Sequence, residues 1–295
     1  MGRMGMPMSR NLLRSAFPLV VYNRSRGKVE ELAGEGAVPA SSPAEVTQGC
    51  DIVLACLPDV ATVQEVFLGE GGVVSASRQG QVLVDHSTIG PSNSKQIAEA
   101  ASRQGACFLD APISGGVERA ADATLTIMVG GDLDVYASAL PVLRAIGTNV
   151  QHVGASGAGS VVKLVNQLLV GIHSLAAAEA LVLGAKGGAD PEVLVDILQS
   201  SWGQSFMMAR NGPTTIDREF SGARAQVRTI LKDLVLIQEF AHEVGSPIAA
   251  GEQAAQVFQE ANDKGLADND LASIVLLLEE ASGCRVERKG PAPRG

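Results

Sequence analysis

The stretch from Gly154 to Gly188 constrains the fold of this chain more than any other. It contains no proline, and its apolar residues recur at three- and four-residue spacing, which predicts one long helix. Roughly 30 residues at a rise of 1.5 Å span about 45 Å, which is long for a helix of a globular protein. Such a helix typically runs between two domains or through a shared core. With 295 residues, the chain is long enough for two domains of ordinary size.

Three polar residues stand near the start of this predicted helix. Lys163, Asn166 and Gln167 are spaced i, i+3 and i+4, so their side chains project from one face. A lysine among so many apolar neighbours either reaches out to water or is buried for chemistry. Gly157 and Gly159, just before the lysine, favour the second interpretation, because they let a backbone or a ligand approach the helix start closely.

The pattern G-x-G-x-x-x-K-x-x-N, about halfway along the chain, resembles the β-hydroxyacid dehydrogenase family, which includes 3-hydroxyisobutyrate dehydrogenase, L-threonate dehydrogenase and semialdehyde reductases. The resemblance extends from Met1 to about Gly283. It implies a Rossmann-like α/β fold, a doubly wound parallel sheet followed by an all-α domain, with a long helix between them. It also implies that Lys163 is the catalytic acid/base and that Asn166 and Gln167 orient its ammonium group and the substrate. Relatives often carry asparagine at the position of Gln167.

The domain boundaries follow from these patterns. Residues 1–153 are expected to form an NAD(P)-binding Rossmann domain, and residues 154–283 a helical domain for substrate binding and dimerisation. After the long helix the pattern stays helical over 191–199, 220–244, 247–264 and 270–281, with no alternating strand pattern. The proline-containing tail, 284–295, is expected to be disordered.

The chain begins inside a dinucleotide-binding motif. The family opens with a strand of the type I-G-F-I-G-L-G-R-M-G, and only the last two glycines of G-x-G-x-x-G are present, as Gly2 and Gly5. We therefore expect a doubly wound sheet without its first, central strand. The resemblance implies that Gly2, Arg3, Met4 and Gly5 hold the cofactor at the start of the first helix.

The residues that select NAD or NADP are expected directly after the predicted strand 18–22. An NAD site usually places Asp or Glu here, whereas an arginine accommodates the 2′-phosphate of NADP. This chain has Asn23, Arg24 and Ser25, which favours NADP over NAD; the alternative is a solvated turn.

Further cofactor contacts are implied by the resemblance. Leu57 and Pro58 end a buried strand that passes the cofactor in relatives, and Thr62 stands where relatives often have asparagine. Thr88 matches a nicotinamide contact; the alternative is that Ser87 beside it simply caps the next helix. Lys232 matches a lysine that reaches the nicotinamide end.

The substrate contacts are expected elsewhere. A strand over 108–113 ends in Ser114, Gly115 and Gly116, which offer a hydroxyl and backbone N–H groups to an anion unless they form a plain turn. In the family this loop holds the substrate carboxylate. Arg119 stands where relatives often have glycine and is expected to change which substrates the pocket accepts. The motif S-G-G-x-x-R-A-A resembles the L-threonate dehydrogenase branch of the family. Asp233 belongs with the substrate contacts by resemblance, and a solvated Lys232–Asp233 pair is the alternative.

Composition excludes several other functions. A net charge of −9 without a basic run argues against nucleic acid as a partner. The sequence shows no leader-like segment and no run of 18 apolar residues, the features that would indicate a membrane protein. The four scattered cysteines are expected to be free thiols in a reducing compartment, so a cytoplasmic location is expected. His173 and Glu179 have no metal-ligand spacing, and no metal site is expected.

These observations predict an NAD(P)-dependent oxidoreductase that interconverts a small hydroxy carboxylic acid with its oxo acid or semialdehyde. The expected assembly is a homodimer or homotetramer formed through the helical domain. The alternative is a non-catalytic cofactor-binding or interaction protein, or an inactive truncated product, on the same scaffold. Longer 6-phosphogluconate dehydrogenases fit poorly, because this chain is shorter and has asparagine rather than histidine at position 166.

Overall fold

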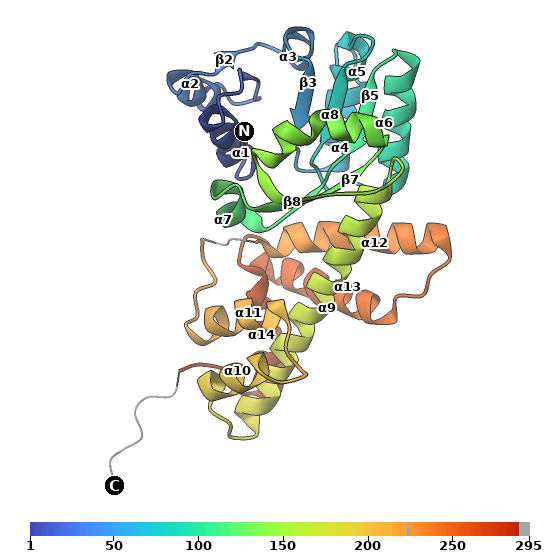
Figure 1. Ribbon diagram of the computed structural model, residues 1–295. Helices are drawn as coiled ribbons and strands as arrows, with labels where there is room; N and C mark the ends of the chain where they lie inside the picture. Colours follow the sequence, from blue (N-terminus) through green and yellow to red (C-terminus); the bar gives the residue numbers. More distant parts are fainter. Residues whose placement is uncertain (223–224, 289–295) are drawn as a thin grey trace. The chain divides into compact units, whose positions relative to one another are not determined.

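The computed structural model describes residues 1–222 and 225–288 (Figure 1). The chain divides into two compact units, Met1–Leu164 and Val165–Gly295. The division falls inside helix α9 (Ala158–Lys186), which has 29 residues. By length and composition alone α9 could cross a membrane. A core helix of a helical domain has the same composition, and Lys163 and Gln167 on α9 are buried.

The first unit contains two separate sheets. The larger sheet has the strand order β3-β4-β5-β7-β6, with β8 paired to β7. Its strands are β3 (Ile52–Ala55), β4 (Val82–Asp85), β5 (Cys107–Asp110), β6 (Ile113–Ser114), β7 (Leu125–Gly130) and β8 (Gly147–Gly154). The strands β3, β4 and β5 are parallel, whereas β7 is antiparallel to both β5 and β6. The sheet of the predicted doubly wound fold is therefore parallel over β3, β4 and β5 and mixed at the end that contains β7.

The smaller sheet pairs β1 (Val20–Val21) with β2 (Val38–Pro39) in parallel. Among the described residues, no strand joins this pair to β3. The chain begins close to both sheets: the amino group of Met1 donates a hydrogen bond to Asn23 Oδ1, just beyond the end of β1. Burial lowers the pKa of this amino group, which is also near enough to Cys56, just beyond β3, to interact with it electrostatically.

Helices cover both faces of the larger sheet, as expected for a doubly wound fold (Figure 1). On one face, α1 (Gly5–Arg14) and α8 (Leu133–Arg144) pack on Val84, Leu109 and Val129. On the other face, α4 (Val60–Leu68) and α6 (Pro91–Arg103) pack on Val53, Leu83 and Phe108. Neighbouring residues such as Leu83 and Val84 belong to opposite faces, as the two-residue period of a strand requires. The unit also contains α2 (Arg26–Gly34), α3 (Pro43–Gly49), α5 (Val73–Ala76) and α7 (Gly116–Ala121).

The second unit is helical throughout its described residues, apart from one isolated bridge between Gln226 and Asp270. After α9 come α10 (Pro191–Gln199), α11 (Phe206–Ile216), α12 (Val227–Val244), α13 (Ala249–Ala261), a π-helical turn (Asn262–Leu266), a 3₁₀ turn (Leu271–Ile274) and α14 (Val275–Ser282). The sequence did not predict α11. Its start is capped by Ser205, whose hydroxyl accepts a hydrogen bond from Met208 N–H.

The residues after α14 differ from their prediction as a disordered tail. Val286 is fully buried, and its N–H donates to Glu279 Oε1 at 2.7 Å. Arg218 Nη1 contacts the same carboxylate at 2.6 Å. Residues 284–288 therefore pack onto the helical unit, and residues 289–295 lie outside the described residues.

Candidate active site

The start of α1 carries the residues predicted to hold the cofactor phosphates. Gly2, Arg3 and Met4 precede the helix, which begins at Gly5. No side chain caps this helix start, and no acidic residue lies in its first turn. An open helix N-terminus presents backbone N–H groups and positive partial charge, which suit a phosphate. The residues present therefore fit the pyrophosphate of a dinucleotide.

The turn after β1 carries the predicted determinant of cofactor choice. Asn23 Nδ2 donates to Ser25 O at 3.0 Å, which closes the turn before α2. Arg24 between them is exposed, and the described residues provide no carboxylate partner for it. Its guanidinium group is therefore accessible to an anion, as recognition of a 2′-phosphate requires.

Ser87 links the ends of two strands instead of capping a helix. Its hydroxyl donates to Asp85 Oδ1 at 2.5 Å and accepts from Leu57 N–H at 2.8 Å. Helix α6 has Gly90 as its N-cap, without a side-chain bond, so the capping alternative for Ser87 is wrong. The bonds of Ser87 instead fix Leu57 after β3 against β4, and Thr88 follows as a half-buried residue.

Pro58 and Thr62 lie at the start of α4. Asp59 caps this helix by accepting a hydrogen bond from Thr62 N–H at 2.8 Å. Pro58 is exposed, and Thr62 is half-buried. The cap thus fixes the backbone of the segment that the family resemblance assigns to the cofactor.

Asp85 is buried with an incomplete set of hydrogen bonds. Its Oδ1 accepts from both the N–H and the hydroxyl of Ser87, whereas its Oδ2 has no partner in the described part of the chain. Burial raises the pKa of Asp85 to about 6, and the hydrogen bonds from Ser87 oppose this rise. The neighbouring charge of Asp110 adds to it.

The raised pKa of Asp85 predicts a pH-dependent stability. The unfolded chain releases this proton near pH 3.8, while the native state keeps it up to about pH 6. The native protein therefore loses stability as pH rises through this window, by on the order of 3 kcal/mol. Asp85→Asn should lack this loss. The difference in free energy of unfolding between this variant and wild type, measured in urea titrations, should therefore shift in favour of the variant between pH 4 and pH 7. Exposed Asp122→Asn is the control; parallel pH curves for Asp85→Asn and wild type would contradict the prediction.

The predicted substrate loop follows β6. Ser114 is half-buried at the end of this strand, where it pairs with Thr126 of β7. Gly115 and Gly116 have φ values of 137° and 70°, which favour glycine. A Cβ at Gly115 would lie 2.6 Å from Arg119 Cδ, so the stem of Arg119 lies against this loop while its residue is exposed. The loop thus presents a hydroxyl and two glycine backbone N–H groups beside a cation.

Lys163 is on the second turn of α9, and only 7% of its surface is exposed. The sequence left open whether this lysine is buried or reaches water; in the structure it is buried. Asp110, which the sequence analysis did not single out, holds the start of the same helix: its carboxylate accepts from the N–H groups of Gly157 and Ser160. The signal available in the sequence was an acidic residue at the end of a buried strand, just before the substrate loop.

In the second unit, four predicted site residues form one polar network. Asn166 Nδ2 donates to Gln167 Oε1 at 2.9 Å, and Gln167 Nε2 donates to Asp233 Oδ2 at 2.5 Å. Lys232 Nζ lies 2.8 Å from Asp233 Oδ1. Asp233 is 2% exposed, so the alternative of a solvated Lys232–Asp233 pair is wrong.

Close packing brings this network together. A Cβ at Gly171 of α9 would lie 2.9 Å from Leu234 Cδ2 of α12. The missing side chain lets the two helices approach, with Gln167 about one turn before Gly171 and Asp233 next to Leu234. The network joins Asn166 and Gln167 of α9 to the Lys-Asp pair of α12, residues 66 positions apart.

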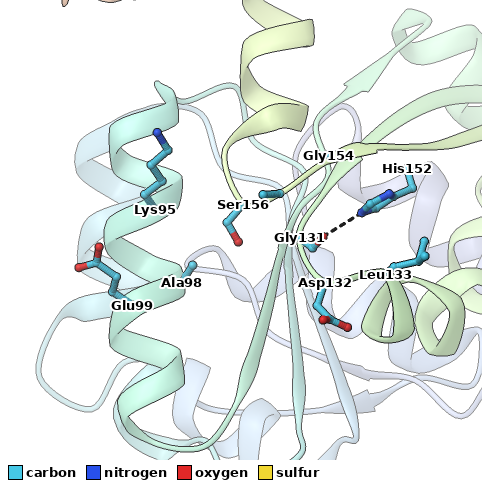
Figure 2. Close-up of a pocket in the computed structure, with 10 residues that line it drawn as sticks. Lys95, Ala98, Glu99, Gly131, Asp132, Leu133, His152, Gly154 and Ser156 are labelled. Atoms are coloured by element: carbon cyan, nitrogen blue, oxygen red, sulfur yellow. Dashed lines mark hydrogen bonds between the residues drawn. The ribbon is translucent and has the colours of Figure 1, made fainter.

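A separate groove of about 720 Å³ lies in the first unit (Figure 2). Its lining includes Lys95 and Glu99 of α6, Asp132 before α8, and His152 of β8. Figure 2 shows His152 directed at Gly131, whose carbonyl oxygen accepts from His152 Nε2 at 2.8 Å. None of the predicted site residues lines this groove. No group of three His, Cys, Asp or Glu side chains that could hold a metal ion occurs within residues 1–222 and 225–288.

Comparison with known proteins gives matches over nearly the whole chain. Residues 1–154 match the model described as "NAD binding domain of 6-phosphogluconate dehydrogenase". Residues 157–278 match "NAD-binding of NADP-dependent 3-hydroxyisobutyrate dehydrogenase". The two matches meet at the residues immediately before α9.

Individual relatives agree with these models. The chain is 36% identical to 2-(hydroxymethyl)glutarate dehydrogenase of Eubacterium barkeri, over 97% of this chain and 95% of that protein. It is 35% identical to mitochondrial 3-hydroxyisobutyrate dehydrogenase of Mus musculus, over 95% and 85%. The crystal structure of 3-hydroxyisobutyrate dehydrogenase from Salmonella typhimurium superposes with a TM-score of 0.84 at 30% identity, over 94% of this chain and 96% of that one. The chain therefore belongs to the 3-hydroxyisobutyrate dehydrogenase, or β-hydroxyacid dehydrogenase, family of NAD(P)-dependent oxidoreductases.

Proposed function

We propose that this protein oxidises a short hydroxy carboxylic acid, or reduces the corresponding oxo acid or semialdehyde, with Lys163 as the general acid/base. The observation that carries the proposal is the burial of Lys163 on a helix whose start is bonded to the strand leading into the Ser114 loop. A lysine acts as a base near neutral pH only when its surroundings lower its pKa from about 10.4, and burial in apolar surroundings is the general cause of such shifts. The nicotinamide, when bound, supplies the hydride acceptor or donor.

The protein's own residues then divide the remaining work. Ser114, Gly115 and Gly116 bind the substrate carboxylate, which leaves the carbinol for Lys163. Lys163 accepts the hydroxyl proton in oxidation and returns it in reduction. Asn166 and Gln167 orient the ammonium group and the substrate, supported by the bond from Gln167 to Asp233. Lys232 contacts the nicotinamide end of the cofactor.

We propose NADP as the preferred cofactor because Arg24 is exposed at the turn that reads the ribose. A charge-assisted contact with the 2′-phosphate is worth roughly 1.5–3 kcal/mol, or about 10–150-fold in affinity. Arg24→Ala should therefore weaken NADPH binding by this factor and leave NADH binding nearly unchanged, as measured by fluorescence titration. Arg26→Ala, which removes an exposed arginine at the first position of α2, is the matched control. Equal losses for both cofactors would show that Arg24 does not contact the 2′-phosphate.

Two relatives of this chain are named for acids with a shared feature. Both 2-(hydroxymethyl)glutarate and 3-hydroxyisobutyrate carry a hydroxymethyl group next to a carboxylate. Arg119 beside the Ser114 loop adds a cation that favours more polar acids, and its sequence context resembles the L-threonate branch. We therefore propose that a polyhydroxylated acid is accepted.

The experiment is an initial-rate panel of these two acids and L-threonate, each with NADP⁺ and NAD⁺. Turnover of L-threonate supports the branch assignment, and turnover of branched aliphatic acids alone would contradict it. Tight NADPH binding without turnover of any acid or semialdehyde would instead favour a non-catalytic cofactor-binding protein.

We also propose a homodimer or homotetramer formed through the helical unit. This unit carries large apolar side chains at the surface, among them Leu183, Ile197 and Phe206, exposed by 76%, 58% and 74%. Exposed apolar side chains of this size are commonly buried at interfaces between subunits.

A further inference from the structure

The start of helix α9 is held by a carboxylate from another element. Asp110, the last residue of β5, accepts hydrogen bonds from Gly157 N–H at 2.7 Å and from Ser160 N–H at 2.8 Å. Because α9 begins at Ala158, these donors belong to its N-cap and N3 positions. In a capping box, the side chains at N3 and N-cap bond these same two groups. Gly157 has no side chain, and the hydroxyl of Ser160 contacts Ser94 at 2.8 Å, so Asp110 satisfies both donors.

The two glycines of the G-x-G motif make this contact possible. A Cβ at Gly159 would lie 2.3 Å from Met128 O and 2.5 Å from Asp110 O. A Cβ at Gly130 of β7 would lie 2.5 Å from Asp110 Oδ1. Gly157 has a φ of 94°, in the left-handed region. The backbone at the helix start thus packs directly against the backbone at the ends of β5 and β7, and the glycines of the motif leave room for this contact.

Asp110 stands between the two parts of the proposed catalytic centre. Ser114 follows it by four residues along the extended chain, and Lys163 follows its partner Ser160 by three residues, about one helical turn. Asp110 is 1% exposed, and both carboxylate oxygens are bonded, so its side chain is fixed. Burial raises the pKa of Asp110, while the two N–H donors oppose this rise.

We propose that Asp110 is a positioning residue for Lys163. Its bonds to Gly157 and Ser160 fix the helical turn that carries the lysine relative to the strand that carries Ser114, and so set the distance between acid/base and carboxylate anchor. This inference rests on the proposed function. A displacement of about 1 Å in a reacting group can cost on the order of 10²-fold in rate, so the loss of one bond should be visible in turnover.

The test is Asp110→Asn in the full chain with NADPH bound. Asparagine keeps the shape and one acceptor oxygen but turns its NH₂ group towards one of the two N–H donors. We expect kcat per NADPH-binding site to fall by on the order of 10²-fold. The KM of the acid and the Kd of NADPH should change little, because the Ser114 loop and the start of α1 are unaltered.

Asp132→Asn is the matched control. Asp132 caps α8 by accepting from Asp134 and Val135 N–H groups at 2.9 and 3.0 Å, the same chemistry at another helix of the same unit. We expect this variant to lose thermal stability but to keep the wild-type kcat per site. If Asp110 were merely structural, Asp110→Asn would behave like the control: fewer protein molecules would be folded and bind NADPH, and kcat per NADPH-binding site would be unchanged.

Hydrogen–deuterium exchange gives a readout that does not depend on activity. Backbone exchange over residues 156–166 should accelerate in Asp110→Asn and stay unchanged in Asp132→Asn. Where Asp110→Asn does not fold, Ser160→Pro removes one of the two donors in a first helical turn, where proline is tolerated. A folded variant of either kind with wild-type kcat, or with unchanged exchange over 156–166, would overturn the inference. Wild-type turnover in Lys163→Ala would instead overturn the proposed function.

Discussion

Lys163→Ala should lower kcat by about 10²–10⁴-fold, the usual contribution of a positioned acid/base. The Kd of NADPH should remain nearly unchanged, because the start of α1 and Arg24, the proposed cofactor contacts, are not altered. The expected kinetic pattern is an equal loss in kcat and kcat/KM, which identifies an interaction made in the transition state. Initial rates with the best acid of the substrate panel, together with NADPH fluorescence titration, measure both quantities.

The control for this prediction lies on the same helix. Lys186 is at the far end of α9, where its ammonium group donates to Ser282 O. Lys186→Ala removes the same side chain from the same helix and should keep the wild-type turnover. A Lys163→Ala enzyme that retains most of its kcat would remove the central claim about this protein's mechanism.

A strand joined ahead of Met1 should stabilise the first unit strongly. Within the described residues, β1 pairs only with β2 and β3 pairs only with β4, so each has one edge without a strand. Met1 lies beside Asn23, beyond β1, and interacts with Cys56, beyond β3. A segment entering at Met1 would therefore run between the two strands and parallel to them.

The expected gain is large because such a strand would be buried on both faces. Each large apolar side chain contributes about 1.5–3 kcal/mol when buried, against a total stability of about 5–15 kcal/mol for a domain. A segment of the I-G-F-I-G-L type should raise the free energy of unfolding in urea by several kcal/mol and tighten NADPH binding. A Ser-Gly segment of equal length is the control. Equal stability of both extended proteins and of residues 1–295 would contradict this prediction.

Features governed by neighbouring residues were predictable from the sequence. The long helix follows from the spacing of apolar residues, and its start is marked by Gly157 and Gly159. The strands β3, β4 and β5 are short apolar runs bounded by polar or turn residues. The lysine motif and the Ser-Gly-Gly loop are contiguous patterns, so the family could be named before the fold was known.

Helix α11 was missed because its local signals conflict. Gly212 and Pro213 lie inside it and normally argue against a helix. Packing outweighs these signals: a Cβ at Gly212 would lie 2.7 Å from Val195 Cγ2, so the glycine is needed where α11 meets α10. The role of Ser87 stayed open in the sequence for a related reason, since its hydroxyl accepts from Leu57 N–H, 30 residues away, and does not cap the next helix.

The contacts that join separate elements of the candidate site are also of this long-range kind. Asp110 reaches Gly157 and Ser160 across 47 and 50 residues, and Gln167 reaches Asp233 across 66. Residue types and spacing singled out Lys163, Asn166 and Ser114 as candidates, because helical period and turn chemistry act over a few positions. The sequence could not show which buried carboxylate meets which amide, because that pairing depends on how strands and helices pack, and a buried polar group takes whichever partner the packing brings within reach.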